Sequence, residues 1–290
     1  MSQQAFPNRI PAAVRAAAVM TAAGAAFAGL NVSLQWATMK AGAPAPAAAF
    51  WQYLIALVLT LPLMLERRSL RTSYPFWHIL RVLLAAGGVQ VWVMGLSVVP
   101  IWQAIALSMT SPFFVVAGAA IFLRERVTPA RLAATVAGFA GAMVILDPWS
   151  ETFTYHALLP VAAAALWAGT SLITKMLTRH EPVSGITVYM LALLLPFNAL
   201  AWGGVGFAMP PAEAWIALAA AGALTALAQY LLTAAYARAD AAYLQPFDDL
   251  KLPLNMLLGW IVFGQAPSVA FWPGAALIVI ASLSLMRRET

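Results

Sequence analysis

The sequence predicts an all-α membrane protein whose ten transmembrane helices form two inverted repeats of five helices. Hydrophobic residues make up 63% of the 290 residues and charged residues only 9%, against about 25% charged residues in an ordinary soluble domain. Apolar runs of about 20 residues, the length that a helix needs to cross a bilayer, recur along the whole chain. A repeat within the sequence then divides these runs into two related halves.

The predicted spans follow one another through connections too short to hold a soluble domain. The N-terminal segment has no cleavage site and leads directly into the first span, so we expect no removed signal peptide. Cysteine is absent, which excludes disulfides and thiol chemistry. We place the ten spans at about residues 13–38, 45–65, 76–97, 101–123, 129–147, 155–177, 183–205, 212–236, 241–263 and 268–287.

The distribution of Arg and Lys sets the predicted orientation, because cytoplasmic loops carry an excess of both residues. With both termini in the cytoplasm, fourteen of the sixteen positive residues, including Arg81 and Lys175, lie on the cytoplasmic side. Lys40 lies outside, and Lys251 lies within a span. The net charge of +6 is therefore interpreted as positive-inside anchoring, and no nucleic-acid partner is expected.

The internal repeat pairs LRERVTPARLAATVAGFAGAMVIL at 123–146 with FGQAPSVAFWPGAALIVIASLSLM at 263–286, at an offset of 140 residues. Each repeat holds five spans, and an odd number inserts the second copy upside down relative to the first. We expect residues 1–148 and 149–290 to be the two copies and to form one integrated transmembrane domain. Inverted repeats are typical of secondary transporters, which bind substrate near the midplane between the halves.

The most informative stretch is 240–264, which is long and apolar enough for a span yet carries Asp248, Asp249 and Lys251. An ionisable group at bilayer depth costs about 2.5–3.5 kcal/mol, so such groups usually face a protein interior or a water-filled cavity. In a helix, Asp248, Lys251 and Asn255 fall on one stripe, which we expect to line a polar cavity. The alternative is a structural ion pair of Asp248 with Lys251, which leaves Asp249 needing another partner or a proton.

Two prolines mark the same region in both halves. Pro253 lies one residue from the repeat counterpart of Pro112, and Ser108 corresponds to Asp248. Interruptions at matching positions of two repeats are the best sequence pointer to a transport site. We therefore predict helix interruptions at Pro112 and Pro253 beside the substrate, with kinks that serve only packing as the alternative.

Other polar and aromatic residues are predicted to line the same cavity. Asn31 and Gln35 lie four residues apart on the first span, where hydrogen bonding between helices is the alternative role. Trp167, at the centre of the sixth span, is suited to stack on an aromatic substrate, with core packing as the alternative. The predicted substrate-cavity residues are Asp248, Asp249, Lys251, Asn255, Trp167, Asn31, Gln35, Gln90, Ser108, Gln229, Tyr230 and Tyr236. Trp36, Tyr53 and Trp102 are predicted to form an outer gate, although an interfacial aromatic belt also explains the tryptophans.

Several classes of chemistry lack their sequence motifs. There is no phosphate-binding glycine loop with Lys, which disfavours ATP-driven transport. No HExxH sequence occurs, and His78, His156 and His180 are expected in loops or interfaces, away from any buried metal site. No catalytic residue, metal or cofactor is therefore predicted. An intramembrane aspartyl enzyme is the rival class, but it needs acids from two helices, whereas both acids here lie on the ninth span.

These features resemble the EamA family of the drug/metabolite transporter superfamily over nearly the whole chain. The matching elements are the ten spans in two repeats and the two closing segments quoted above, although Gln265 stands where the family usually has Glu. The PFDDLKLP segment at 246–253 looks like a subfamily variant, and the size and pattern are similar to YddG-type exporters of aromatic amino acids.

The resemblance implies a multi-pass carrier of the bacterial inner membrane that exports small metabolites by alternating access and is not an enzyme. Aromatic or other amino acids are the expected substrates, with other metabolites or drugs as the alternative. For a zwitterionic amino acid, Lys251 would attract the carboxylate and an Asp the ammonium group. The expected partners are this small molecule and membrane lipid, and the expected state is a monomer.

Overall fold

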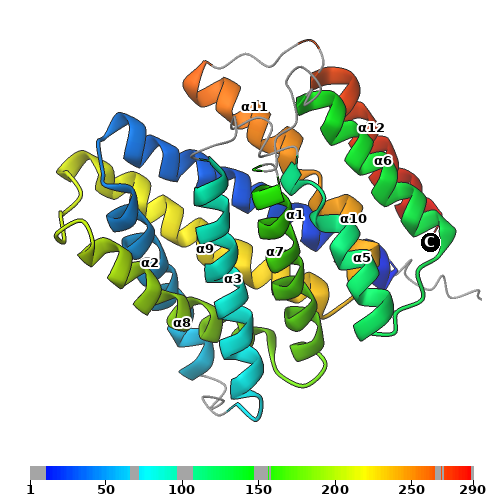
Figure 1. The fold of residues 1–290 in the computed structure, drawn as a ribbon, viewed down its shortest axis with the longest axis horizontal. Helices are drawn as coiled ribbons and strands as arrows, with labels where there is room; N and C mark the ends of the chain where they lie inside the picture. Colours follow the sequence, from blue (N-terminus) through cyan, green and yellow to red (C-terminus); the bar gives the residue numbers. More distant parts are fainter. Residues whose placement is uncertain are drawn as a thin grey trace, which may run out of the picture.

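The computed structural model describes residues 11–65, 72–96, 107–146, 156, 158–264, 269 and 271–288. Within these residues, all regular secondary structure is helical (Figure 1). The all-α prediction is therefore confirmed for the described part of the chain. Five helices are long and apolar enough to cross a membrane, and several shorter apolar helices accompany them.

The helices of the first half follow the first five predicted spans. The first span ends in a short π-helical segment, η1, and the helix α5 of the fourth span begins at Ser111. The elements are α1 (Ala12–Gln35), η1 (Trp36–Lys40), α2 (Ala45–Leu65), α3 (Pro75–Leu96), α5 (Ser111–Phe122) and α6 (Pro129–Leu146).

The second half follows the other five predicted spans, but its fourth span is divided between two helices. The described elements are α7 (Leu158–Leu177), α8 (Val183–Gly203), η4 (Ala212–Ala214), α9 (Trp215–Tyr236), α10 (Ala241–Asp248), α11 (Lys251–Phe263) and α12 (Phe271–Arg288). With α10 and α11 counted as one interrupted span, the described helices match the ten predicted spans in order.

The two predicted proline interruptions coincide with helix starts. Pro112 is the second residue of α5, and Pro253 is the third residue of α11. Proline fits the first turn of a helix because its missing N–H would have no partner there anyway. Its ring opposes continuation from the preceding turn, which explains why each span is broken just before its proline.

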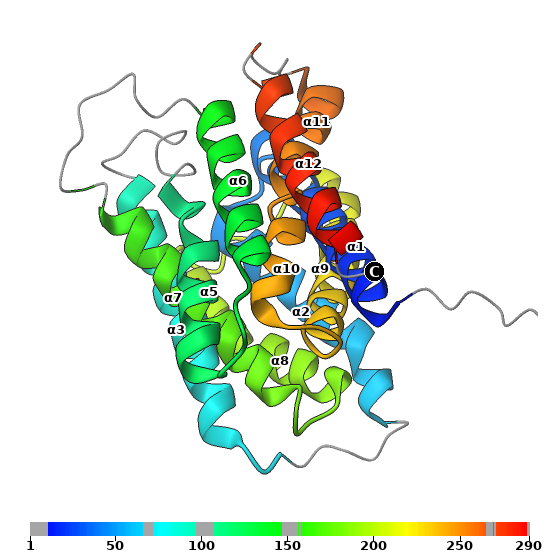
Figure 2. The ribbon, with the colours of Figure 1, turned by 90° about the vertical axis from the view of Figure 1, so that its right-hand side faces the viewer.

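Helix packing joins the two halves along their whole length. The helix α1 packs on α9 and α11, α2 packs on α8 and α9, and α3 packs on α7. The last helix of each half, α6 and α12, pack side by side at one flank (Figures 1 and 2). Small residues permit these close contacts; a Cβ at Gly141, for example, would lie 2.7 Å from the backbone oxygen of Gly274.

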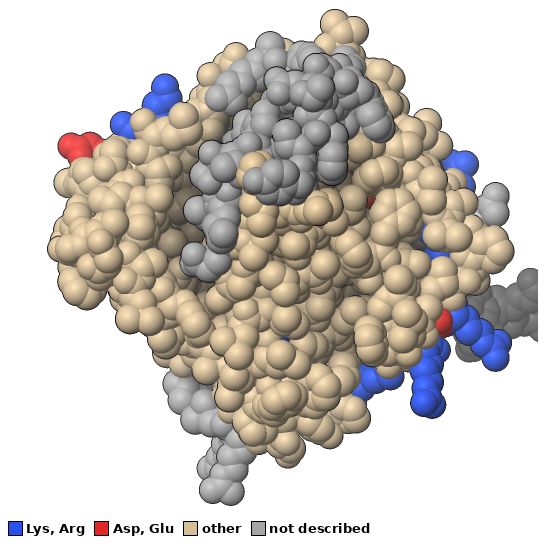
Figure 3. All heavy atoms as spheres, viewed as in Figure 1, with Lys and Arg blue, Asp and Glu red and all other residues tan. Residues whose placement is uncertain are grey.

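The two ends of the described chain lie at the same end of the bundle. The last turn of α12 lies near the first turn of α1 (Figures 1 and 2), as an even number of spans requires. In the view of Figure 3, Lys and Arg side chains gather along the edge where these two ends lie. Below, this edge is called the inner end, following the orientation that the charge distribution predicts.

Two positive residues that were counted as surface anchors are instead buried. Arg81 is 2% exposed and donates to the backbone oxygen of Ile186 and to Thr174 Oγ1. Lys175 is buried near the end of α7 and donates to the backbone oxygens of Tyr236, the last residue of α9, and of Ala239. The prediction that all cytoplasmic Arg and Lys residues act as surface anchors is therefore wrong for these two. Their positive groups are buried and donate to backbone oxygens.

Candidate functional site

The candidate site is centred on the break between α10 and α11. Asp248 ends α10 and Lys251 begins α11, so the two side chains lie three residues apart and meet across the break. The Nζ atom of Lys251 lies 2.6 Å from Oδ2 of Asp248, and the two side chains are 34% and 18% exposed respectively. The ion pair that the sequence analysis gave as the alternative is present, and its partial exposure leaves both groups open to a ligand.

Amide side chains extend this polar surface along α11 and across to α1. Asn255, one turn after Lys251, donates from Nδ2 to the backbone oxygen of Lys251 at 2.7 Å. Its Oδ1 accepts a hydrogen bond from Nδ2 of Asn31 at 3.0 Å. Asn31 is exposed. We call Asp248, Lys251, Asn255 and Asn31 the polar stripe, and it offers a cation, an anion and amide groups on one accessible face.

A close approach of α1 to α11 holds the polar stripe together. Gly24 of α1 lies against the first residue of α11, and a Cβ there would lie 3.4 Å from the Cβ of Lys251. Tyr236, buried at the end of α9, interacts with the side chains of Ser171 and Gln245 and lies close enough to Lys251 to act on its charge. The backs of α10 and α11 are thus fixed by α1 and α9 while the ion pair stays accessible.

Asp249 does not share the polar stripe. Its side chain is 4% exposed and faces α6, where a Cβ at Gly138 would lie 2.5 Å from its Oδ2. Within the described part of the chain, this Oδ2 atom has no hydrogen-bond partner. The two adjacent acids therefore have different surroundings: Asp248 is paired and partly exposed, whereas Asp249 is buried against α6.

The other predicted cavity residues lie at varied depths. Gln229 and Tyr230 of α9 are half-buried, as is Trp167 of α7, whereas Ser108 is buried just before α5. The indole of Trp167 packs on α3, where a Cβ at Gly88 would lie 2.6 Å from its Nε1. The side chain of Gln90 falls outside the described residues. No described contact joins these residues to the polar stripe, and they stay predictions.

The predicted outer gate is only partly described. Trp36 is 38% exposed at the start of η1, and Gln35 donates to Met39 Sδ within the same segment. Tyr53 packs against apolar residues of α3, α8 and α9 around Val82 and Leu191. Trp102 lies outside the described residues. The gate formed by these three residues therefore stays a prediction.

A charged network at the inner end was missed by the sequence analysis. The carboxylate of Glu125 accepts from the backbone N–H groups of Ala241 and Ala242, at 3.1 and 3.2 Å, and so caps α10. Arg131 of α6 pairs with Asp240 at 2.7 Å. Lys175 donates to the backbone oxygens of Tyr236 and Ala239 at 2.8 and 2.6 Å.

Every one of these contacts joins the first half of the chain to the second, or α7 to the segment between α9 and α10. Together, Glu125, Arg131, Lys175 and Asp240 form what we call the inner network. An anion at a helix N-terminus is stabilised by the free N–H groups and the helix dipole. The sequence signal was the Arg-Glu-Arg run at 124–126, which reads as positive-inside anchoring unless its contact with α10 is known.

A second buried cluster corrects the prediction for histidine. His78 lies inside α3 with a 1% exposed side chain, and its Nε2 is 2.7 Å from Oε2 of Glu181. Thr72 donates to the other carboxylate oxygen of Glu181, and the ring of Tyr189 packs on His78. His78 was expected in a loop or interface. Its burial reflects the cover that the α7–α8 turn provides.

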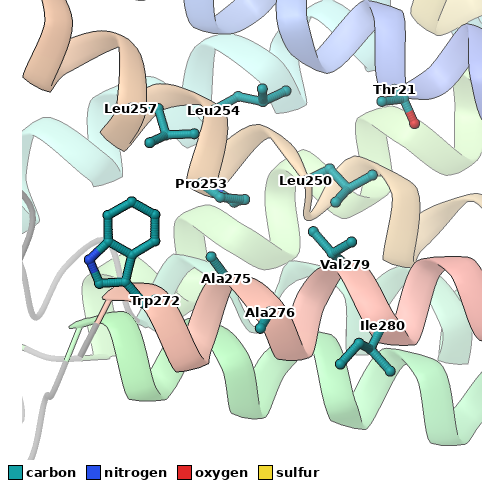
Figure 4. Close-up of a pocket in the computed structure, with 10 residues that line it drawn as sticks. All are labelled: Thr21, Leu250, Pro253, Leu254, Leu257, Trp272, Ala275, Ala276, Val279 and Ile280. Atoms are coloured by element: carbon teal, nitrogen blue, oxygen red, sulfur yellow. The ribbon is translucent and has the colours of Figure 1, made fainter. Parts of the chain in front are cut away.

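An apolar groove lies on the other side of the α10–α11 break. It has a volume of about 500 Å³ and is lined by residues of α1, α11 and α12, among them Thr21, Pro253 and Trp272 (Figure 4). Its lining is almost wholly hydrophobic and includes no residue of the polar stripe. We therefore do not identify this groove with the predicted polar cavity.

The comparison with family models accounts for both halves of the chain. The EamA-like transporter family matches residues 15–147 and 154–287, which are the two predicted repeats. The chain belongs to the EamA-like transporter family. The members of this family are multi-pass membrane transporters, in agreement with the apolar helices described above.

Similar proteins carry names that specify a cargo. The chain is 57% identical to the riboflavin transporter of Brucella anthropi, covering 93% of this chain and 98% of that protein. It is 55% identical to the riboflavin transporter of Rhizobium johnstonii, covering 100% of this chain and 96% of that protein, and 47% identical to that of Vibrio cholerae, with 93% and 92% covered. A solved structure with a TM-score of 0.74 and 23% identity covers 92% of this chain and 99% of its own, and supports the fold alone.

More distant EamA relatives differ in cargo and in direction. The S-adenosylmethionine uptake transporter of Rickettsia bellii is 28% identical over 83% of each chain, and the pseudopaline exporter of Pseudomonas aeruginosa is 28% identical over 66% of this chain and 68% of its own. These names support a transporter of small molecules. They do not support an aromatic amino acid as cargo, and they include both uptake and export.

Proposed function

We propose that this EamA protein carries riboflavin across the bacterial inner membrane, with both termini in the cytoplasm. The observation that carries the proposal is the identity of 57% and 55%, over nearly complete chains, to two proteins named riboflavin transporters. The proposal replaces the amino acid cargo expected from the narrower resemblance to YddG-type exporters. As for all such carriers, the two halves would expose the site alternately to each side.

The chemistry of the polar stripe suits a flavin. Riboflavin is uncharged and combines a flat tricyclic ring, whose pyrimidine edge has carbonyl oxygens and an N–H group, with a polyhydroxyl chain. Asn31 and Asn255 offer donors and acceptors of the kind that this edge requires, and the Asp248–Lys251 pair offers both to hydroxyl groups. A neutral cargo leaves the ion pair intact, since it brings no charge that either partner must compensate.

An aromatic surface near the membrane centre would hold the ring system. Trp167 has the flat face that stacking requires, and its contact with Gly88 fixes the orientation of the indole. The proposal therefore assigns the pyrimidine edge and the polyhydroxyl chain to the polar stripe and the ring face to Trp167. We assign no fixed direction of transport, because one relative is named for uptake and another for export. The riboflavin gradient and any coupled ion would set the direction of net flux.

The proposal is tested with purified protein in liposomes loaded with riboflavin, whose own fluorescence reports its release. We expect efflux well above that of protein-free liposomes and inhibition by excess lumiflavin, which keeps the ring and lacks the polyhydroxyl chain. Tryptophan and S-adenosylmethionine serve as competitors of other cargo classes and should leave efflux unchanged. Efflux equal to that of empty liposomes, or tryptophan flux that riboflavin does not inhibit, would reject riboflavin as the cargo.

A further inference from the structure

The two acids at the helix break share a single lysine. Asp248 is paired with Lys251 at 2.6 Å, so the only cation of the break is already engaged. Asp249 is 4% exposed, and its Oδ2 has no hydrogen-bond partner within the described residues. An isolated buried carboxylate costs far more free energy than a neutral acid, and such a group is normally neutralised instead.

Within the described part of the chain, Lys251 is the one positive group that acts on Asp249. The charged groups that act on it are Asp248 and Lys251 of its own segment. Its neighbours Leu250 and Leu252 pack with Ala142 and Ile278, which come from α6 and α12.

Four ionisable groups on or beside the packed elements have partners elsewhere. Glu125, after α5, caps α10, and Arg131 of α6 pairs with Asp240. Lys175 of α7 donates to the backbone after α9, and Tyr236 of α9 interacts with Ser171 and Gln245. The charges of two acids and one lysine sum to zero only when one acid is protonated. Asp248 accepts from the lysine, so Asp249 is the acid that carries the proton.

The position of Asp249 is built into the packing of α6. A Cβ at Gly138 would lie 2.5 Å from Oδ2 of Asp249, so only glycine leaves room for the carboxyl group against the backbone of α6. The acid is therefore held in a niche, next to the break where α10 and α11 meet. Any movement at the break that separates it from α6 would take Asp249 out of this niche and into contact with water.

We propose that Asp249 is the proton-binding site of this carrier, protonated while it lies against Gly138 and deprotonated when the helix break moves away from α6. The proton passes between the carboxyl group and water, so one proton is taken up and one released in each transport cycle. This inference rests on the proposed riboflavin transport, whose cargo site on the polar stripe lies beside Asp249. The coupled ion of the carrier is then a proton.

The proposal is tested in riboflavin-loaded liposomes with an entrapped pH-sensitive dye. We expect riboflavin flux of the natural protein to change several-fold when a pH gradient is imposed, and to be accompanied by proton movement. In Asp249→Asn, whose amide mimics the neutral acid, riboflavin exchange should remain detectable while the proton movement and the effect of the gradient are lost. Riboflavin flux that carries no protons and ignores the gradient in the natural protein would overturn the inference while leaving the cargo assignment intact.

A second readout does not depend on transport. Infrared difference spectroscopy of the purified protein should show the carbonyl band of a protonated carboxylic acid that is absent in Asp249→Asn and retained in Asp240→Asn. An unchanged band in Asp249→Asn would contradict a protonated Asp249.

A matched pair of variants on α6 separates the niche from general packing. Gly138→Ala should shift the pH dependence of flux, because its methyl group displaces the carboxyl group of Asp249. Gly141→Ala meets α12 instead and should lower the yield of folded protein without that shift. Equal pH profiles in both variants would contradict a niche at Gly138.

Discussion

We expect the ion pair of Asp248 with Lys251 to serve both stability and transport. The pair is partly exposed, so it does not bear the full desolvation cost of a buried pair. Pairing places the two charges on the face that also carries Asn255 and Asn31. A pair that served stability alone would be better replaced by apolar side chains.

Removal of one partner should therefore harm stability more than removal of both. In Asp248→Asn or Lys251→Met, an unpaired charge remains, and we expect a loss of about 1–3 kcal/mol in the free energy of unfolding, below the roughly 3–5 kcal/mol of fully buried pairs because of the exposure. The double variant should recover much of the folded yield, measured by detergent thermal unfolding, but riboflavin flux should stay at least about tenfold below the natural level. Natural flux in the double variant would show that the pair is only structural.

At the scale of elements, the interrupted ninth span is what the sequence predicted best. Pro112 and Pro253 lie in the first turns of α5 and α11, whereas Pro62, Pro196 and Pro246 lie inside continuous helices. The helix that the side chain of Asp249 faces could not be predicted in the same way. A regular helix through 248–255 gives the stripe, but the break and the niche at Gly138 depend on how α6 packs.

Contacts between distant segments were equally beyond the sequence. Glu125 stands between two arginines, which locally suggests anchoring or a gating ion pair, and only the fold brings it to the N–H groups of α10. Arg81 was counted on the cytoplasmic side and His78 was expected in a loop or interface, whereas Ile186 of α8 and Glu181 of the α7–α8 turn bind their side chains. Such burial is set by the partner segment, which local composition does not reveal.

The cap that Glu125 forms on α10 should control access from the inner end. Glu125→Gln keeps the shape of the side chain but loses the charge that favours the helix N-terminus, a contribution of about 0.5–1 kcal/mol or more. Because the chain has no cysteine, a single introduced one, Ala239→Cys, can report access cleanly. We expect faster labelling by a charged maleimide in Glu125→Gln than in the control Arg126→Gln, and equal rates would show that the cap does not hold the inner end closed.

At the scale of the whole molecule, two five-helix repeats pack so that most helix pairs cross between the halves. Composition, the internal repeat and the charge distribution were enough to predict this architecture. Each of these features belongs to the chain as a whole and does not depend on any single contact. The cargo was not predictable from the same features. Amides, an ion pair and a tryptophan suit both an amino acid and a flavin, and the choice between them comes from the relatives.

The most direct test asks whether riboflavin occupies the polar stripe. With Asn255→Cys as the only cysteine, the rate of labelling by a small maleimide is measured at increasing concentrations of riboflavin, with tryptophan as the control ligand. If riboflavin binds along the stripe, labelling should slow several-fold and saturate with riboflavin, while tryptophan should have no effect. A labelling rate that riboflavin leaves unchanged, in protein that still transports it, would place the flavin elsewhere and contradict the site.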